Sequence, residues 1–156
     1  MTMRFAVLFA SAMVAAFPAF AGNDWVPPVK DPLVLKECGQ CHMAFQPAFL
    51  PARSWNRMMD ELPNHFGEDA SLPAEKREAI RQYLTANAGD VLMAGRARKY
   101  MQWVAPEGKP QKITENPDFQ RKHRLPDKVW ADPKVVTKSN CPACHRGAEQ
   151  GLYDDD

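Results

Sequence analysis

Beyond its N-terminal segment, the chain has no hydrophobic run long enough to span a bilayer, which takes about 20 residues. It also lacks an excess of charge of either sign, since 20 basic residues stand against 19 acidic ones. Stretches that alternate apolar and polar residues, the pattern of a half-buried strand, are few and short. These absences argue against a membrane-spanning chain, a nucleic-acid-binding protein and a β-rich fold.

The N-terminal segment predicts an export signal. Arg4 gives a short basic region, an apolar run from Phe5 to Phe17 follows, and Ala19-Phe20-Ala21 offers the small residues that signal peptidase reads. We expect residues 1–21 to be a signal peptide cleaved after Ala21, and the mature protein to be exported. A retained N-terminal anchor is the less favoured alternative. Cleavage would remove Arg4 and no acidic residue, leaving 19 basic residues against 19 acidic ones.

The remaining sequence predicts a mainly α-helical protein in two small parts. In the first part, residues 22–104, helical patterns are expected over four stretches: 31–43, 53–62, 71–88 and 90–104. Pro63 is expected to stop the second of these helices and Gly89 to cap the third. Ile80, Tyr83, Leu84 and Ala88 share one face of that third helix.

Two prolines and a glycine in residues 105–110 predict a boundary between the parts. The second part, residues 105–156, is expected to be irregular with short helices. Thr114 is a candidate cap for one of them, and Ser139 or Asn140 for another. A turn is expected at Asp132-Pro133, and a polar, frayed tail from Gly151, in which Tyr153 is the residue suited to packing.

Two short motifs carry the chemistry: Cys38-Gly39-Gln40-Cys41-His42 and Cys141-Pro142-Ala143-Cys144-His145. In a helical turn, positions i, i+3 and i+4 lie on one face. Two thiols at such positions can add to the two vinyl groups of one porphyrin, and the histidine that follows can ligate the iron. The motifs therefore predict two covalently attached haem c groups, tethered by Cys38, Cys41, Cys141 and Cys144, with His42 and His145 as iron ligands.

Four cysteines could also form disulfides, a zinc site or a redox-active dithiol. Two disulfides would suit an exported protein. A zinc ribbon usually has about 15–20 residues between its cysteine pairs, whereas 99 residues separate Cys41 from Cys141. A redox-active dithiol would be expected near a βαβ pattern, and neither pair has one. None of these alternatives explains a histidine directly after both pairs.

His65 and His123 are the two histidines outside the motifs. Their number matches the two remaining iron positions, which predicts bis-histidine ligation, with His65 at the first haem and His123 at the second. A crossed arrangement is left open by the spacing. Methionine is the rival sixth ligand, with four candidates: Met58, Met59, Met93 and Met101. Basic residues around His123, in Arg121-Lys122-His123-Arg124, could pair with haem propionates, and Trp55, Trp103 and Trp130 are expected to pack around the porphyrins.

The chain resembles the small periplasmic dihaem cytochrome c family. The resemblance rests on five stretches: Trp55 with Met58-Met59, His65 to Leu72, Ile113-Thr114, Ser139 to His145, and Ala148 to Gly151 with the Asp-rich tail. The first half is also similar to a class I cytochrome c, with His65 in place of the usual methionine. The resemblance implies electron transfer by two bis-histidine, low-potential haems. Its implied redox partners include a small oxygen-binding monohaem cytochrome and a membrane b-type cytochrome.

The expected function is therefore an electron carrier rather than an enzyme, because an iron with six ligands has no position for a substrate. The alternative is a haem enzyme of the peroxidase or nitrogen-oxide reductase type, in which one distal histidine is displaced. A gas-binding sensor is a third possibility, and it would need a five-coordinate iron.

Overall fold

The computed structural model describes residues 25–93 and 95–153, so the predicted signal peptide lies outside the described residues. Seven α-helices are present in these ranges: α1 (Pro32–Cys38), α2 (Ala52–Asp60), α3 (Ala74–Ala86), α4 (Gly89–Leu92), α5 (Arg96–Met101), α6 (Pro117–Lys122) and α7 (Asp127–Trp130). Five short 3₁₀ helices join them: η1 (Pro47–Phe49), η2 (Leu62–Asn64), η3 (Ile113–Glu115), η4 (Cys141–Ala143) and η5 (Ala148–Gln150). Pairing of β type in the described chain is limited to two isolated bridges, so the mainly α-helical fold is confirmed. No helix of these ranges combines the length and apolar character needed to cross a membrane.

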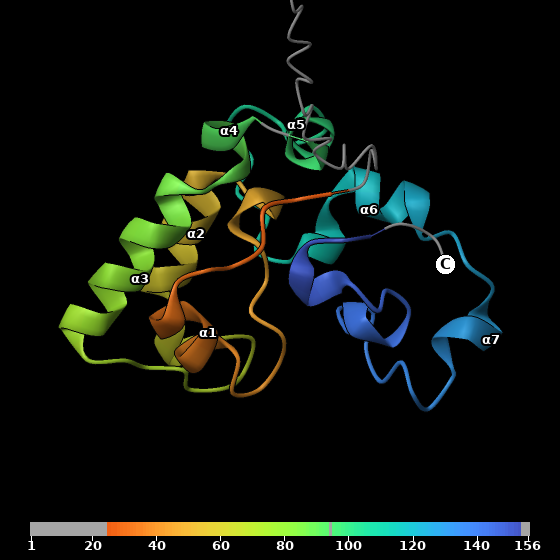
Figure 1. The fold of residues 1–156 in the computed structure, drawn as a ribbon, viewed down its shortest axis with the longest axis horizontal. Coiled ribbons are helices and arrows are strands. Elements are labelled where there is room, and N and C mark those ends of the chain that lie inside the picture. Colours follow the sequence, from red (N-terminus) through yellow and green to blue (C-terminus); the bar gives the residue numbers. More distant parts are fainter. Residues whose placement is uncertain (1–24, 94, 154–156) are drawn as a thin grey trace, which may run out of the picture.

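The first three helices form the left-hand part of the molecule in Figure 1, where α2 and α3 pack against each other. Asp31 caps α1 by accepting hydrogen bonds from the backbone N–H groups of Leu33 and Val34 at 2.8 and 3.0 Å. The helix ends at Cys38, five residues before the expected end, with Gly39 as its C-cap. The first motif therefore lies in a turn that continues from the helix.

Two further expectations about helix ends are wrong. The second helix ends at Asp60, before Pro63, because the chain tightens into η2, which includes that proline. The third helix is capped by Asn87, and Gly89 begins α4 instead of ending α3. Ile80 and Leu84 do share the buried face of α3, as its periodicity predicts.

The single helical segment expected over residues 90–104 is broken in two. Met93 and Gly95 both have positive φ values, 46° and 51°, which an α-helix cannot accommodate. The break lets α5 start with a hydrogen bond from Arg96 N to Trp25 O at 3.1 Å. The tertiary contact with Trp25 thus overrides the local helix propensity of residues 90–104.

In the second part, Asn116 and not Thr114 begins α6. The fully buried Asn116 accepts a hydrogen bond from Asp118 N at 2.8 Å and donates one to Tyr100 O at 3.1 Å. Helix α7 was not expected from the sequence. Asp132 makes the expected turn by accepting from Lys134 N, whereas the Asn140 side chain donates to Lys134 O and does not cap η4.

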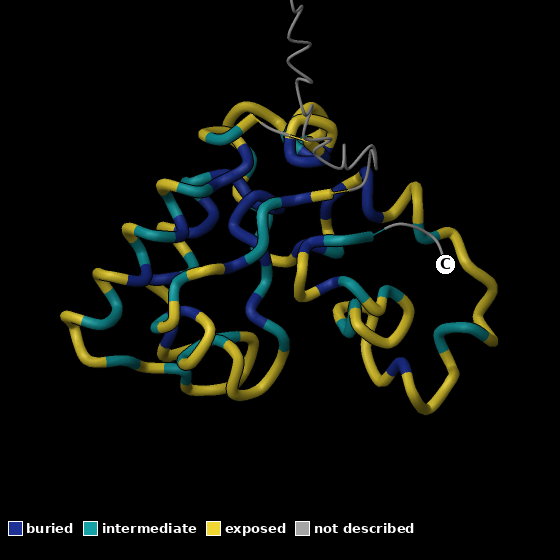
Figure 2. The backbone as a smooth tube through the Cα atoms, viewed as in Figure 1, coloured by how far each residue is buried: buried dark blue, intermediate teal, exposed yellow. Residues whose placement is uncertain are grey.

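Buried side chains are distributed unevenly between the two parts (Figure 2). Most of the apolar core belongs to residues 26–100, and the second part adds few members to it: Ile113, Phe119, Val135 and Ala148. Between residues 121 and 147, Val135 is the single buried residue. The second part therefore has almost no protein core of its own.

Among the contacts that join the parts, three sets involve Arg53, Val26 and Arg96. The Arg53 side chain donates to the carbonyls of Gly108 and Ala105, which fixes the expected linker against α2. Val26 N donates to Gly151 O at 2.9 Å, and Tyr153 packs against the core, as expected of this residue. Residues 151–153 are thus held in place, and the Asp-rich end of the tail lies outside the described residues. Gly151 has φ +79°, and a Cβ there would lie 1.9 Å from Val26 O, which explains the glycine at this close approach.

The third set is a buried ion pair between α5 and α6. Asp118 is 1 % exposed and lies 2.7 Å from the Arg96 guanidinium, while Arg121 pairs with its other oxygen. Removing one partner of such a buried pair destabilises a protein by about 3–5 kcal/mol. We expect Asp118→Ala to lower the free energy of unfolding by that amount, measured by chemical denaturation of the haem-loaded protein.

The matched control is Asp60→Ala, because Asp60 also pairs with an arginine, Arg81, but is exposed to solvent. Exposed ion pairs contribute about 0–1 kcal/mol. Equal losses in the two variants would contradict the structural importance given to the Asp118 pair.

Candidate functional site

The first motif brings two thiols and an imidazole to the end of α1. Cys38 is half-buried and Cys41 is exposed. Burial raises the pKa of the Cys38 thiol to about 11. No disulfide joins any of the four motif cysteines in the described chain, so all four sulfurs are available for attachment to haem vinyl groups.

The His42 ring is held in a defined orientation. Its Nδ1 lies 2.7 Å from Met43 O, and its ring stacks on Phe45 with centroids 4.9 Å apart. A carbonyl oxygen can only accept a hydrogen bond, so Nδ1 carries the proton. The Nε2 lone pair is then available to a metal ion.

A tight turn brings His65 opposite His42. The turn follows η2 and is closed by hydrogen bonds between the backbones of His65 and Glu68, at 2.7 and 3.2 Å. Its two central residues, Phe66 and Gly67, both have positive φ values. The ring centroids of His42 and His65 lie 6.2 Å apart with 27° between their planes.

This spacing can be compared with the length of a metal bond. A metal–imidazole bond is about 2 Å long, so two imidazoles on opposite sides of one metal ion hold their ring centroids about 6 Å apart. The pair of His42 and His65 meets that distance. Burial, and then the nearness of the His42 imidazole, lower the pKa of His65, which favours the neutral imidazole that binds metal.

A cavity of about 1010 Å³ lies between these groups. Its lining includes the residues of the first motif, His65, and apolar core side chains such as Trp55 and Ile80. Trp55 is buried and donates from Nε1 to Pro47 O at 2.8 Å. Among the rival ligands, Met58 and Met59 line this cavity, whereas Met93 is exposed.

The second motif forms a similar turn on a shorter element. Cys141 begins η4 and Cys144 is its C-cap, and the backbone N–H groups of Cys144 and His145 donate to Cys141 O at 3.2 and 2.8 Å. Burial raises the pKa of the Cys141 thiol to about 11. The turn places both thiols and His145 along a second, smaller cavity.

His123 lies across that cavity, at the C-terminal end of α6. Its Nδ1 is 2.9 Å from Phe119 O, and its ring stacks on Phe119 with centroids 3.9 Å apart and planes at 13°. The His123 and His145 centroids are 6.1 Å apart, and their planes meet at 79°. The distance again fits two imidazoles on opposite sides of one metal ion, by the same bond length of about 2 Å.

The His145 ring differs from the other motif histidine in one respect. Its Nδ1 is buried and has no hydrogen-bond partner among the described residues. Such an orphaned polar atom is uncommon in a folded interior.

The chemistry of the two sets of side chains fits two haem groups, since each set offers two thiols for tethering and two opposed imidazoles for the iron.

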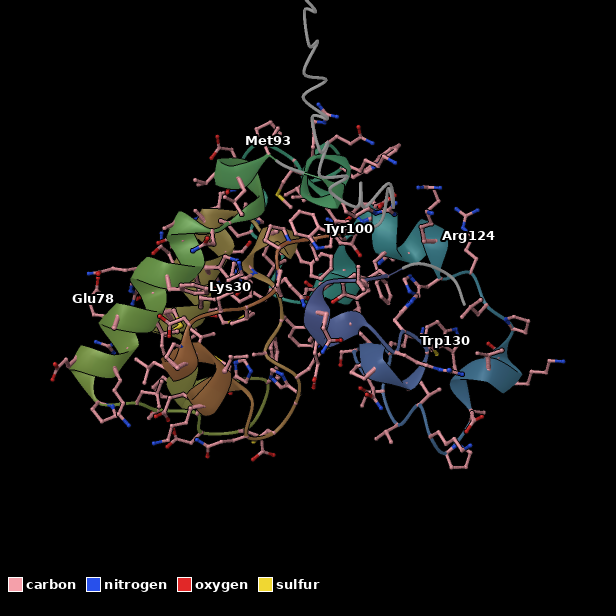
Figure 3. The ribbon with its side chains drawn as sticks, in the orientation of Figure 1. Lys30, Glu78, Met93, Tyr100, Arg124 and Trp130 are labelled. Carbon is pink, nitrogen blue, oxygen red and sulfur yellow. The ribbon has the colours of Figure 1, made fainter. Side chains whose placement is uncertain are left out.

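The structure thus pairs His42 with His65 and His123 with His145, which is the uncrossed arrangement of the two left open by the sequence. Of the basic residues near His123, Arg121 pairs with Asp118, and the pairing of these residues with haem propionates stays a prediction. Trp130, labelled in Figure 3, lines the second cavity, whereas Trp103 is about half exposed.

The side chains that orient the imidazoles were not expected from the sequence. Phe119 precedes His123 by four residues on α6, so helical spacing could have indicated this contact. Phe45 follows His42 in an irregular segment, where no such spacing applies. Gln46 and Tyr153, which contact each other across the two parts, gave no local signal.

The chain is similar to known dihaem cytochromes c. A family model described as dihaem cytochrome c matches residues 34–153. No curated protein matches the chain. A solved structure, the diheme cytochrome c from Rhodobacter sphaeroides, is 47% identical with a TM-score of 0.74, covering 81% of this chain and 99% of that one.

A second solved structure, the diheme cytochrome type c from Shewanella baltica OS155, is 36% identical with a TM-score of 0.63. That match covers 79% of this chain and 86% of the Shewanella protein. From the match over residues 34–153 and from these identities, the chain belongs to the dihaem cytochrome c family and carries two covalently bound c-type haems.

Proposed function

We propose that the protein is a periplasmic electron-transfer protein with two bis-histidine, low-potential haems. The observation that carries this proposal is the pairing of each motif histidine with a second histidine. The centroid distances are 6.2 Å for His42 and His65 and 6.1 Å for His123 and His145. Family membership supports two haems, and the opposed imidazoles support six ligands at each iron.

Each residue has a definite task in this proposal. Cys38 and Cys41 tether the first haem, with His42 as the proximal ligand and His65 as the distal one. Cys141 and Cys144 tether the second haem. Its proximal ligand is His145 and its distal ligand is His123. Hydrogen bonds to Met43 O and Phe119 O keep Nδ1 protonated on His42 and His123, so that Nε2 is the atom that would bind iron.

The haems supply a reversible one-electron change at iron, and the chain determines what else that iron can do. With His42 and His65 binding one iron, and His145 and His123 the other, neither iron would have a position left for oxygen or peroxide. Nitrogen ligation on both sides also gives a lower potential than histidine with methionine. The side chains therefore favour electron exchange over substrate chemistry, and the proposed protein is a carrier rather than an enzyme.

The proposed organisation has a first haem domain over residues 22–104 and a second over 105–156. Export to the periplasm, with cleavage of a signal peptide after Ala21, is supported by the pattern of residues 1–21. Its partners are then redox proteins. A small oxygen-binding monohaem cytochrome and a membrane b-type cytochrome are the two candidates.

We expect the oxidised protein to give low-spin signals alone in low-temperature electron paramagnetic resonance (EPR). The reduced protein should bind no carbon monoxide, because both irons already have six ligands. A spectroelectrochemical titration should place both haems below the potential range of histidine–methionine cytochromes. These three measurements use the purified haem-loaded protein.

The same measurements identify the alternative function. A haem enzyme of the peroxidase or nitrogen-oxide reductase type needs an iron that can open a position. A substantial high-spin fraction, or carbon monoxide binding to one haem of the unaltered protein, would count against the carrier and in favour of that enzyme.

A further inference from the structure

His145 is held differently from His42 and His123. Each of those two rings has Nδ1 within hydrogen-bond distance of a backbone carbonyl, at 2.7 Å and 2.9 Å. The Nδ1 atom of His145 is buried and has no such partner among residues 25–93 and 95–153. The orientation of this imidazole must therefore depend on contacts to the face and edge of its ring.

A closed series of contacts starts and ends at His145. Ala148 N donates to His145 O at 3.0 Å, and Ala148 O accepts from Nε2 of Gln46 at 2.7 Å. Oε1 of Gln46 accepts from the Tyr153 hydroxyl at 2.5 Å. The Tyr153 ring then meets the His145 ring edge-on, with centroids 5.5 Å apart and planes at 63°.

The two side chains of this series that lie outside the second motif, Gln46 and Tyr153, are both held in place. Gln46 is fully buried, and both ends of its amide are used, so the amide cannot turn without losing a hydrogen bond. Tyr153 is held at its hydroxyl by Gln46 and at its ring by Phe49, which meets it edge-on at 5.1 Å. Burial raises the pKa of Tyr153, which keeps the hydroxyl protonated as a donor.

The planes of the two histidine pairs differ in their relative orientation. His42 and His65 lie at 27°, whereas His123 and His145 lie at 79°. In a low-spin ferric haem, the angle between the axial imidazole planes determines how the iron d orbitals split. Near-parallel planes give a rhombic EPR signal, and near-perpendicular planes give a strongly anisotropic signal at low field.

We propose that Gln46 and Tyr153 are positioning residues that hold the His145 imidazole nearly perpendicular to that of His123. The proposal rests on the proposed ligation of the second haem by these two histidines. Gln46 also follows Phe45, whose ring stacks on His42, so one short segment of the first part orients ligands in both sites. Gln46 and Tyr153 touch no iron themselves and act through His145.

The test is EPR of the oxidised, haem-loaded protein and of two variants, Tyr153→Phe and Gln46→Leu. The unaltered protein should show one rhombic signal and one strongly anisotropic low-field signal. Each variant should lose most of the low-field signal, through a shift or a broadening, because the His145 ring is no longer held. The rhombic signal of the first haem should not change.

Tyr83→Phe is the matched control. It also removes a hydrogen-bonded tyrosine hydroxyl, which accepts from Lys30 N at 3.0 Å. Tyr83 lies on α3, away from the second site. Both signals should be unchanged in this variant. Tyr153→Phe removes a single oxygen atom, so it remains a test if Gln46→Leu fails to fold.

The outcomes separate this proposal from the one it rests on. Unchanged low-field signals in Tyr153→Phe, even with a lower melting temperature, would show a merely structural role and overturn the positioning proposal. Two rhombic signals in the unaltered protein would also overturn it. High-spin iron in the unaltered protein would instead contradict bis-histidine ligation itself.

Discussion

His65→Ala and His123→Ala are each expected to convert one haem, and not the other, to a high-spin form that binds carbon monoxide. Each substitution removes a sixth ligand and leaves an open iron position, while the proximal histidine and the two thioether tethers stay in place. Carbon monoxide binding should rise from none in the unaltered protein to one equivalent per chain in each single variant. A titration of the reduced protein, followed by absorbance, measures this directly.

The EPR spectrum shows which haem has changed. His65→Ala should remove the rhombic signal expected from the pair at 27°, and His123→Ala the low-field signal expected from the pair at 79°. The opposite result would indicate crossed ligation. Asn64→Ala and Arg124→Ala are controls at exposed neighbouring positions, and both should keep two low-spin haems. If neither histidine variant became high-spin, the distal assignments would be wrong.

Much of the first part could be predicted because its signals are local. The face of α3 formed by Ile80 and Leu84 follows from helical periodicity, and Asp31 with Pro32 indicates the start of α1. The break between α4 and α5 could not be predicted in this way. It depends on the pairing of Arg96 with Trp25, about 70 residues earlier in the chain, and residues so far apart leave no common pattern.

In the candidate site too, features with a local sequence signal could be predicted and features that depend on long-range contacts could not. The motifs and the count of four histidines predict all eight side chains that the structure gathers into two sets. The orientation of those side chains could not be predicted. Gln46 bonds to Ala148 and Tyr153 across more than 100 residues, so its role depends on how the tail packs and not on its neighbours in sequence.

The packing of the tail also changes how the two parts should be regarded. Residues 105–110 look like a linker in the sequence, yet Arg53 of α2 binds the carbonyls of Ala105 and Gly108. The second part is closely attached to the first and has little core of its own. Its stability should therefore depend on its haem and on the first part, whereas the first part has a larger set of buried side chains.

Removing both tethers of one haem should consequently have very different effects at the two sites. Replacing Cys38 and Cys41 together by alanine is expected to abolish the native fold. The proposed place of the first haem is lined by core side chains such as Trp55 and Ile80. Without the haem these apolar side chains lose their packing partner and meet water, and the total stability of a typical protein is only about 5–15 kcal/mol.

Replacing Cys141 and Cys144 together by alanine should instead leave a folded first part with one low-spin haem. Intact mass should be lower by one haem, and trypsin should cleave rapidly within residues 121–140, where Val135 is the single buried residue. The rhombic EPR signal should persist. Each single variant, Cys41→Ala or Cys144→Ala, keeps one tether and serves as the control, with both haems retained. Equal loss of structure in the two double variants would contradict this asymmetry, because it would mean that the small core around the second haem supports the first part as strongly as the first part supports it.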